Sequence, residues 1–160
     1  MQFTQSISYP GTVDEVVAMY LTPAYLERRF GQFVVDGSST VSVEGERVSF
    51  AGTVCPELIP AAAARFVKSD LRVTFTEEWA TNEAGATSRT SVTVDGAPVS
   101  VEATSTLNPS DAGSAREVSG NLSVRVPLLG GRIEKEAVAH LGRVVEREQA
   151  LATQWLEEHR

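Results

Sequence analysis

One long amphipathic helix is predicted at the end of the chain, over residues 128–160. At about 100° of rotation per residue, its apolar side chains gather within one arc of roughly 100°. They are Ile133, Ala137, Leu141, Val144, Leu151, Ala152 and Trp155. Almost all of the preceding chain alternates apolar and polar residues, which is typical of strands. Since such a helix needs an apolar surface to cover its stripe, the sequence predicts a curved sheet closed over by the helix.

Seven strands are predicted before this helix, with two short helices after the first strand. Strand 1 is expected over residues 3–9, and Thr12 with Glu15 forms a capping box that starts the first short helix. Pro23 starts the second helix and Gly31 ends it. The other strands are expected at Gln32–Val43, Glu46–Cys55, Asp70–Ala80, Thr87–Val94, Val99–Leu107 and Arg116–Val126. Because short turns join them, we expect an antiparallel sheet.

Two connections carry their own signals. The run Val94-Asp95-Gly96-Ala97 predicts a tight hairpin, and Asp-Gly suits the two positive φ angles of a type I′ turn. The interval Pro56–Val67 contains two prolines and four consecutive alanines. We expect it to cross the rim of the sheet with one helical turn.

Composition limits the partners. The 160 residues fit one domain, and the net charge of -7 argues against nucleic acid or an anionic membrane as a main partner. The most apolar stretch, Leu58–Ala64, is far too short to span a bilayer, so no stable membrane insertion is expected. Cys55 is the only cysteine, and no signal peptide is visible. These features predict a cytoplasmic protein.

The order of elements resembles the helix-grip fold of the START-like superfamily, which includes birch pollen allergen-like proteins and polyketide cyclases. The stretch Val124–Glu134, VRVPLLGGRIE, is similar to the junction before the terminal helix in an actinobacterial family, the domain of unknown function 2505. The stretch Tyr20–Leu26, YLTPAYL, resembles that family's break between the short helices. The resemblance implies an α+β fold and an apolar ligand held between sheet and helix. It implies no catalytic residues.

Three ionisable residues could carry chemistry. Glu148 lies mid-stripe on the terminal helix, where desolvation would raise the pKa of its carboxyl group; alternatively it pairs with an arginine at the sheet rim. His140 lies at the edge of the stripe, roughly 12 Å from Glu148 along the helix. Glu77 shares its strand phase with Phe75 and Trp79 and is expected to point inward, where it could form an acid/base pair with Glu148.

The remaining cavity candidates are apolar. They are Phe50, Phe75, Trp79, Leu141, Val144 and Trp155. Small residues on the inner face are expected to leave space for a ligand, namely Gly52, Ala103, Gly120 and Ala137. No spacing supplies three metal ligands, and no cofactor motif is present, so we expect neither a metal nor a cofactor.

Three functions remain open at this stage. The first is non-catalytic binding of an apolar or lipid-like small molecule between the sheet and the terminal helix. The second is a cyclase- or hydrolase-like enzyme that uses Glu148 with His140 or Glu77. The third is a protein-interaction module with a packed core, which uses the segment Leu58–Phe66 as an apolar contact patch. The sequence does not determine the oligomeric state.

Overall fold

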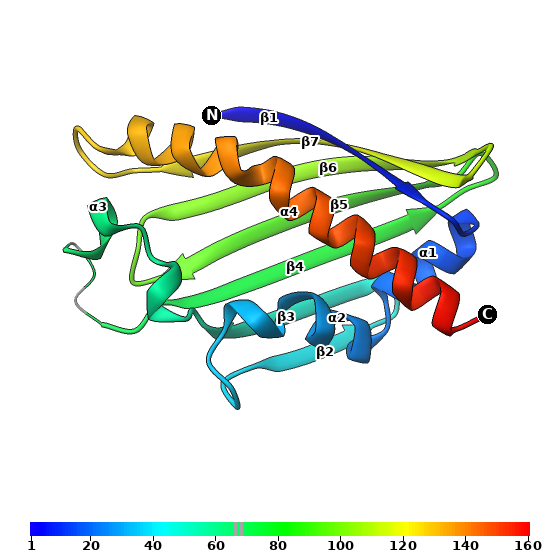
Figure 1. Ribbon diagram of the computed structural model, residues 1–160, viewed down its shortest axis with the longest axis horizontal. Helices are drawn as coiled ribbons and strands as arrows, with labels where there is room; N and C mark the ends of the chain where they lie inside the picture. Colours follow the sequence, from blue (N-terminus) through cyan, green and yellow to red (C-terminus); the bar gives the residue numbers. More distant parts are fainter. Residues whose placement is uncertain (66, 68) are drawn as a thin grey trace.

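A seven-stranded antiparallel sheet and a long helix dominate the structure (Figure 1). The computed structural model describes residues 1–65, 67 and 69–160. The strands are β1 (Gln2–Tyr9), β2 (Thr40–Glu44), β3 (Arg47–Thr53), β4 (Arg72–Thr81), β5 (Ala86–Asp95), β6 (Val99–Ser110) and β7 (Gly113–Val124). The α-helices are α1 (Val13–Tyr20), α2 (Pro23–Phe30), α3 (Ala61–Ala64) and α4 (Gly130–Glu158). Two 3₁₀ turns complete the set, η1 (Gly31–Phe33) and η2 (Pro56–Leu58).

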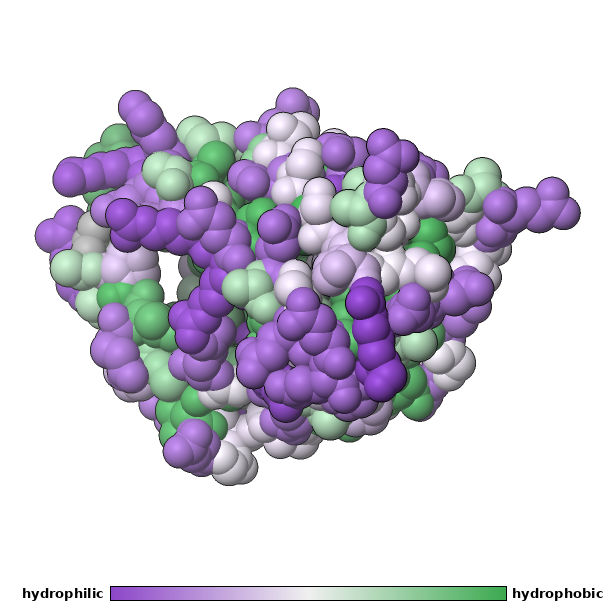
Figure 2. Space-filling view, turned by 45° about the vertical axis from the view of Figure 1, so that its right-hand side comes forward, coloured by the Kyte–Doolittle hydropathy of each residue, from purple (hydrophilic) through white to green (hydrophobic). Residues whose placement is uncertain are grey.

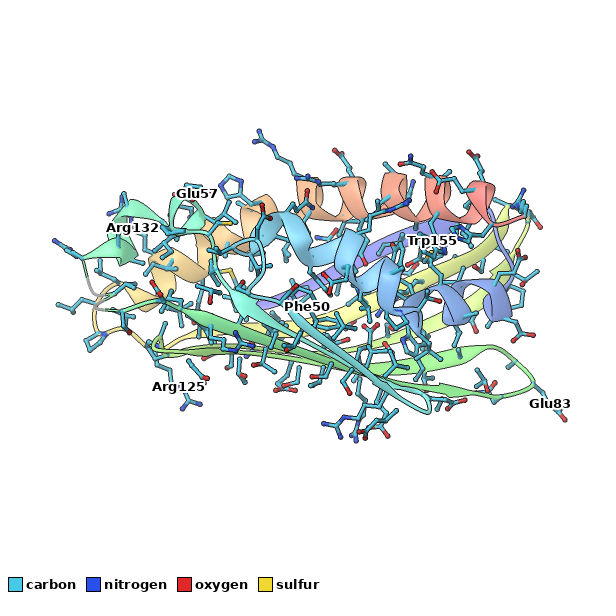
Figure 3. The ribbon with its side chains drawn as sticks, turned by 90° about the horizontal axis from the view of Figure 1, so that it is seen from below. Phe50, Glu57, Glu83, Arg125, Arg132 and Trp155 are labelled. Carbon is cyan, nitrogen blue, oxygen red and sulfur yellow. The ribbon has the colours of Figure 1, made fainter. Side chains whose placement is uncertain are left out.

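The strand order is β1-β7-β6-β5-β4-β3-β2, and every neighbouring pair is antiparallel. Helix α4 crosses one face of the sheet diagonally in Figure 1, and Figure 3 shows the helices as a layer over the sheet. The predicted architecture is therefore confirmed: a curved antiparallel sheet of seven strands that grips a C-terminal helix, with α1 and α2 between the first two strands.

The short helices form where the capping residues predict them. The Thr12 side chain accepts a hydrogen bond from the Glu15 amide, and the Glu15 carboxylate accepts one from the Thr12 amide. Pro23 is the first residue of α2, and Gly31 is its C-cap. Helix α1 lies at one end of the sheet and α2 lies over β2 and β3, and both contact α4 (Figure 1).

Two local predictions were wrong. The strand expected from Gln32 begins only at Thr40, because residues 31–33 form η1 and Val34 makes just one isolated bridge, to Val54. The hairpin at Asp95-Gly96 is present, but only Gly96 has a positive φ angle. A type I′ turn needs positive φ at both central residues, so this turn belongs to another class. The connection after Cys55 contains η2 and the single-turn helix α3, as expected, although Phe66 and Lys68 lie outside the described residues.

The small residues of the inner face do not all leave space. A Cβ atom on Gly120 would lie 2.6 Å from Cζ of Phe3 and 2.8 Å from Cβ of Ala103. A Cβ atom on Gly52 would lie 2.8 Å from Cγ1 of Val34. The expectation of open space was therefore wrong at these two glycines, since larger neighbours already fill it.

Helix α4 buries less of its stripe than the helical wheel predicts. Ile133, Ala152, Trp155 and Leu156 are buried, whereas Val144 is 44% exposed. The buried residues lie near the two ends of the helix, so the middle of α4 is only partly covered by the sheet. No helix within the described residues is long and apolar enough to cross a membrane.

The two glycines Gly120 and Gly142 provide a matched test of packing. We expect Gly120→Ala to destabilise the fold by about 1–3 kcal/mol, because its methyl group would overlap Phe3 and Ala103. Gly142→Ala, with nothing within 4 Å of the added Cβ, is expected to stabilise α4 by about 1 kcal/mol. Urea denaturation measures both changes. Equal effects of the two substitutions would contradict the close approach at Gly120.

Candidate functional site

Four charged side chains meet inside the fold. The Glu77 carboxylate lies 2.9 Å from a terminal nitrogen of Arg116 and 3.8 Å from Nη1 of Arg29. Nη2 of Arg29 in turn lies 2.6 Å from Oε1 of Glu148. We call these four residues the buried ion cluster. They come from α2, β4, β7 and α4, so the cluster joins both layers of the fold.

Hydroxyl and indole groups complete the coordination of Glu77 and Arg116. Thr90 donates to Oε2 of Glu77 at 2.8 Å, and the Trp79 indole donates to Oε1 at 3.0 Å. Arg116 donates to the hydroxyl oxygens of Ser88 and Ser105 at 3.1 and 3.0 Å. Strand alternation places all six side chains on the inner face, because each lies an even number of residues from its buried neighbours.

Aromatic rings surround the two guanidinium groups. Arg116 lies 4.8 Å from the centroid of Trp79 and 5.0 Å from that of Tyr20, and Arg29 lies 4.9 Å from the Tyr20 ring. The Tyr20 hydroxyl donates to Glu148 at 3.1 Å. Tyr20 therefore contacts both arginines and one carboxylate. Cation–π contact offsets part of the cost of burying the two positive charges.

Several groups in and around the cluster have shifted pKa values. In each case the shift favours the ordinary charge state of the group. Burial acts to raise the pKa of the Glu77 carboxyl group, but attraction to Arg116 and Arg29 outweighs it and holds the pKa below the usual 4.5. Burial opposes the charge of Arg116, yet attraction to Glu77 leaves its pKa well above the usual value. Burial and the charge of Glu148 raise the pKa of the Tyr20 phenol. Glu77 is thus an anion and Tyr20 a neutral donor.

In the structure, the predicted acid and base candidates either lie apart from one another or form ion pairs with arginine. Glu148 is partly buried, points inward and is paired with Arg29, which combines the two alternatives drawn from the helical wheel. Glu77 also points inward, but Arg29 lies between the two carboxylates. His140 is exposed to solvent and does not lie beside Glu148. The described residues contain no group of three His, Cys, Asp or Glu side chains that could hold a metal ion.

The predicted apolar candidates fill the core. Phe50 and Phe75 are buried and pack against Phe30, with ring centroids 5.1 and 4.6 Å from it. Trp79 is buried in the ion cluster, and Trp155 is buried against Tyr25. Figure 3 shows Phe50 and Trp155 between the helical layer and the sheet. Leu141 and Val144, in the middle of α4, remain partly exposed.

An apolar cavity lies at the other end of the molecule. Its volume is about 240 Å³, and it lies, partly open to solvent, between the first turns of α4, the segment around η2 and α3, and the adjacent strand ends. The described residues that line it are all apolar: Val54, Leu58, Ile59, Pro60, Ala63, Val67, Leu71, Val94, Gly96, Ala97, Pro98, Val99, Leu122, Val124, Val126, Ile133 and Ala137. Figure 2 shows the surface hollowed on its left-hand side, with apolar residues beside the opening.

The residues that line this cavity differ from the predicted set. None of the nine predicted cavity residues lines it: Glu148, His140, Glu77, Trp79, Phe75, Phe50, Leu141, Val144 and Trp155. This cavity between the sheet and the terminal helix lies beneath the first turns of α4, at Ile133 and Ala137, whereas the predicted helix residues begin at His140. Of the small residues singled out, Ala137 alone lines it. The signal that could have found it is the unusual Pro- and Ala-rich segment Pro56–Val67.

A second and larger hollow is a poor candidate for an apolar ligand. It measures about 730 Å³ and is lined by charged and polar residues such as Arg47, Glu78, Arg89 and Glu102. These side chains alternate with the inward-facing ones along β3 to β6, so they lie on the outer face of the sheet. An antiparallel sheet commonly exposes one polar face to water.

Comparison with known proteins agrees with this architecture. Residues 4–156 match the family described as "Protein of unknown function (DUF2505)". The chain belongs to this family. An uncharacterized protein of Mycobacterium tuberculosis, Rv0481c, is 27% identical over 166 residues, which cover 96% of this chain and 95% of the relative.

Two solved structures share the fold at low sequence identity. Ara h 8.0201 has a TM-score of 0.61 and 11% identity, with 99% of this chain and 98% of the other covered. Norcoclaurine synthase from Thalictrum flavum, in complex with dopamine and hydroxybenzaldehyde, has a TM-score of 0.58 and 12% identity. That alignment covers 100% of this chain and 87% of the synthase. The fold is thus the birch pollen allergen-like helix-grip fold.

The ion cluster gives this protein a defined dependence of stability on pH. Because the folded pKa of Glu77 is depressed, its contribution is complete above its unfolded pKa of about 4.3. That contribution is lost as pH falls through the lower folded value. We expect the difference in unfolding free energy between wild type and Glu77→Gln to shrink between about pH 5 and pH 2. Urea denaturation across this range measures the difference, and a constant value would contradict the ionised state of Glu77.

Removal of one arginine should show how much a buried carboxylate without its partner destabilises the fold. We expect Arg116→Met to destabilise the fold by about 3–5 kcal/mol, because Glu77 loses its nearest counter-charge in a buried site. Arg28→Met is the matched control, since the Arg28–Glu158 pair is about 40% exposed on both sides and should contribute less than about 1 kcal/mol. Both variants are compared by urea denaturation at neutral pH. Similar losses of unfolding free energy in the two variants would show that burial of the Glu77–Arg116 pair does not raise its contribution to stability.

Proposed function

We propose that the protein binds an apolar small molecule or lipid-like compound in the cavity beneath the first half of α4, in the cytoplasm and without catalysis. The observation that supports this proposal is the apolar character of the described residues that line a partly open volume of about 240 Å³. Ligand pockets are typically concave and mostly apolar, with volumes from about 300 Å³ upward. This cavity lies just below that range and therefore suits a compact ligand.

The position of the charged groups supports binding over catalysis. Glu77 and Glu148 are engaged by arginines, and His140 is exposed, so none of the three presents a free acid or base to the cavity. Transfer of apolar surface from water into such a cavity contributes roughly 25 cal/mol per Å². Burial of the ligand's apolar surface is thus the main source of affinity at this site.

The fold comparisons are compatible with this proposal. Norcoclaurine synthase, which shares the fold, was crystallised with dopamine and hydroxybenzaldehyde, two aromatic compounds. The identity of 12% carries no residue-level argument to this chain. What transfers is the architecture, in which a curved sheet and a long helix enclose space between them.

The alternative of an interaction module gains less support. Its contact patch was predicted at Leu58–Phe66, of which Phe66 lies outside the described residues. Leu58, Ile59 and Ala63 of that segment line the cavity and so contribute to the protein's own interior. Leu58 nevertheless stays 48% exposed.

A substitution that fills the cavity tests the proposal. We expect Ala137→Phe to weaken binding of the uncharged fluorescent probe N-phenyl-1-naphthylamine by at least about tenfold, because the new ring would occupy the cavity. Ala139→Phe is the control, since Ala139 is exposed on the same helix two residues away. Fluorescence titration measures the Kd, and thermal unfolding confirms that both variants fold. Equal Kd values for the two variants, or no binding to wild type, would refute the site.

A further inference from the structure

The turn that leads into α4 contains an unusual residue. The amide of Leu129 donates to the carbonyl of Val126 at 3.3 Å, which closes a four-residue turn with Pro127 and Leu128 at its centre. Leu128 has a φ angle of +66° and is the only non-glycine residue with positive φ within the described chain. Proline followed by a residue of positive φ is the pattern of a type II turn, whose third position normally carries Gly or Asn.

Leucine at this position has a steric cost that Gly or Asn would largely avoid. Packing does not compensate for this cost, because the Leu128 side chain is fully exposed to solvent. Leu128 has a backbone conformation that is unfavourable for leucine, and no contact inside the protein compensates for it. Such a residue indicates a functional role at the surface.

A second exposed leucine lies at the same cavity. Leu58, 48% exposed, lines the cavity from η2, and Val126 lines it at the start of the turn that carries Leu128. Leu58 and Leu128, the exposed leucine pair, are the two most exposed large apolar side chains of the described residues. Both therefore belong to the segments that border the cavity.

Basic residues flank Leu128 in the sequence. Arg125 and Arg132 precede and follow Leu128 in the sequence, and both lie at the same end of the molecule in Figure 3. Arg132 extends from the helical layer and Arg125 from the side of the sheet. Glu57 lies at this end as well and limits the local excess of positive charge.

We infer that this end of the protein docks transiently on a phospholipid bilayer, so that an apolar ligand passes between the bilayer and the cavity. The inference rests on the proposed function, since a ligand of that chemistry resides in lipid. The leucine pair would enter the apolar boundary of the bilayer, while Arg125 and Arg132 contact the phosphate groups. With a net charge of -7, the protein is not drawn to anionic surfaces as a whole, so the contact is local and weak.

A protein partner fits these observations less well. A stable protein interface buries about 800 Å² on each partner around large anchor residues. The exposed leucine pair is far smaller than this and includes no aromatic side chain. Binding to a lipid surface scales with the apolar area buried, so two leucines suit a weak and reversible contact with a bilayer.

The experiment measures transfer of the same probe from loaded protein to phosphatidylcholine vesicles that carry an energy acceptor. In stopped-flow fluorescence, we expect the wild-type transfer rate to rise in proportion to vesicle concentration, as it does when transfer requires contact. Leu128→Asn should lower that rate by about tenfold, because one exposed leucine is lost from the contact. Asn accepts positive φ, so the turn is retained and the Kd in solution should be unchanged. Val35→Asn, at a 41% exposed valine outside the cavity lining, is the control and should transfer like wild type.

The outcomes separate this inference from the proposed function. A rate independent of vesicle concentration, or an equal rate in Leu128→Asn, overturns docking and leaves ligand binding intact. If wild type binds no probe, the proposed function fails, and flotation of wild type and Leu128→Asn with the same vesicles then decides docking: loss of flotation in the variant supports it, and equal behaviour overturns it. A dimer in light scattering that Leu128→Asn dissociates would assign the leucines to a second copy of the chain and overturn membrane docking.

Discussion

The ion pair between Glu77 and Arg116 is the interaction on which the interior depends. Both residues lie on the inner face of the sheet, on β4 and β7, and are nearly inaccessible to solvent. A buried charge without a partner costs several kcal/mol, so each must keep the other. Arg29 then joins Glu77 to Glu148, and this connection sets α2 and α4 in position over the sheet. A well-packed apolar replacement would be about as stable, which makes positioning the main consequence of the cluster.

This cluster divides the space between the layers into two parts. Beneath the second half of α4, charged and aromatic side chains fill the interior and interact with one another. Beneath the first half, the lining is apolar and a volume of about 240 Å³ stays open. The segment that contains the short helix α3 borders that open part, which therefore lies at the end of the molecule opposite to α1 and the C-terminus (Figure 1).

The regular elements could be predicted because their signals are local. The alternation of Phe3, Ile7 and Tyr9 identifies β1, and the capping box of Thr12 and Glu15 identifies the start of α1. Residues 32–39 were assigned to a strand, but a strand also needs a partner, and only Val34 finds one there. The wheel of α4 correctly turns Glu148 inward, since helical geometry alone decides that direction. It could not show that Arg29, more than a hundred residues earlier, pairs with it.

The sequence by itself determined the order of elements, the antiparallel sheet, the terminal helix and the inward direction of Glu77 and Glu148. These follow from periodicity and short-range capping, which depend on neighbours within a few residues. Only the tertiary structure decided where the space lies, because a void depends on how distant residues fill the volume around it. Phe3 and Val34 occupy the space beside Gly120 and Gly52, whereas Ala137 lines the cavity. The candidate site is therefore a product of packing between segments far apart in the chain.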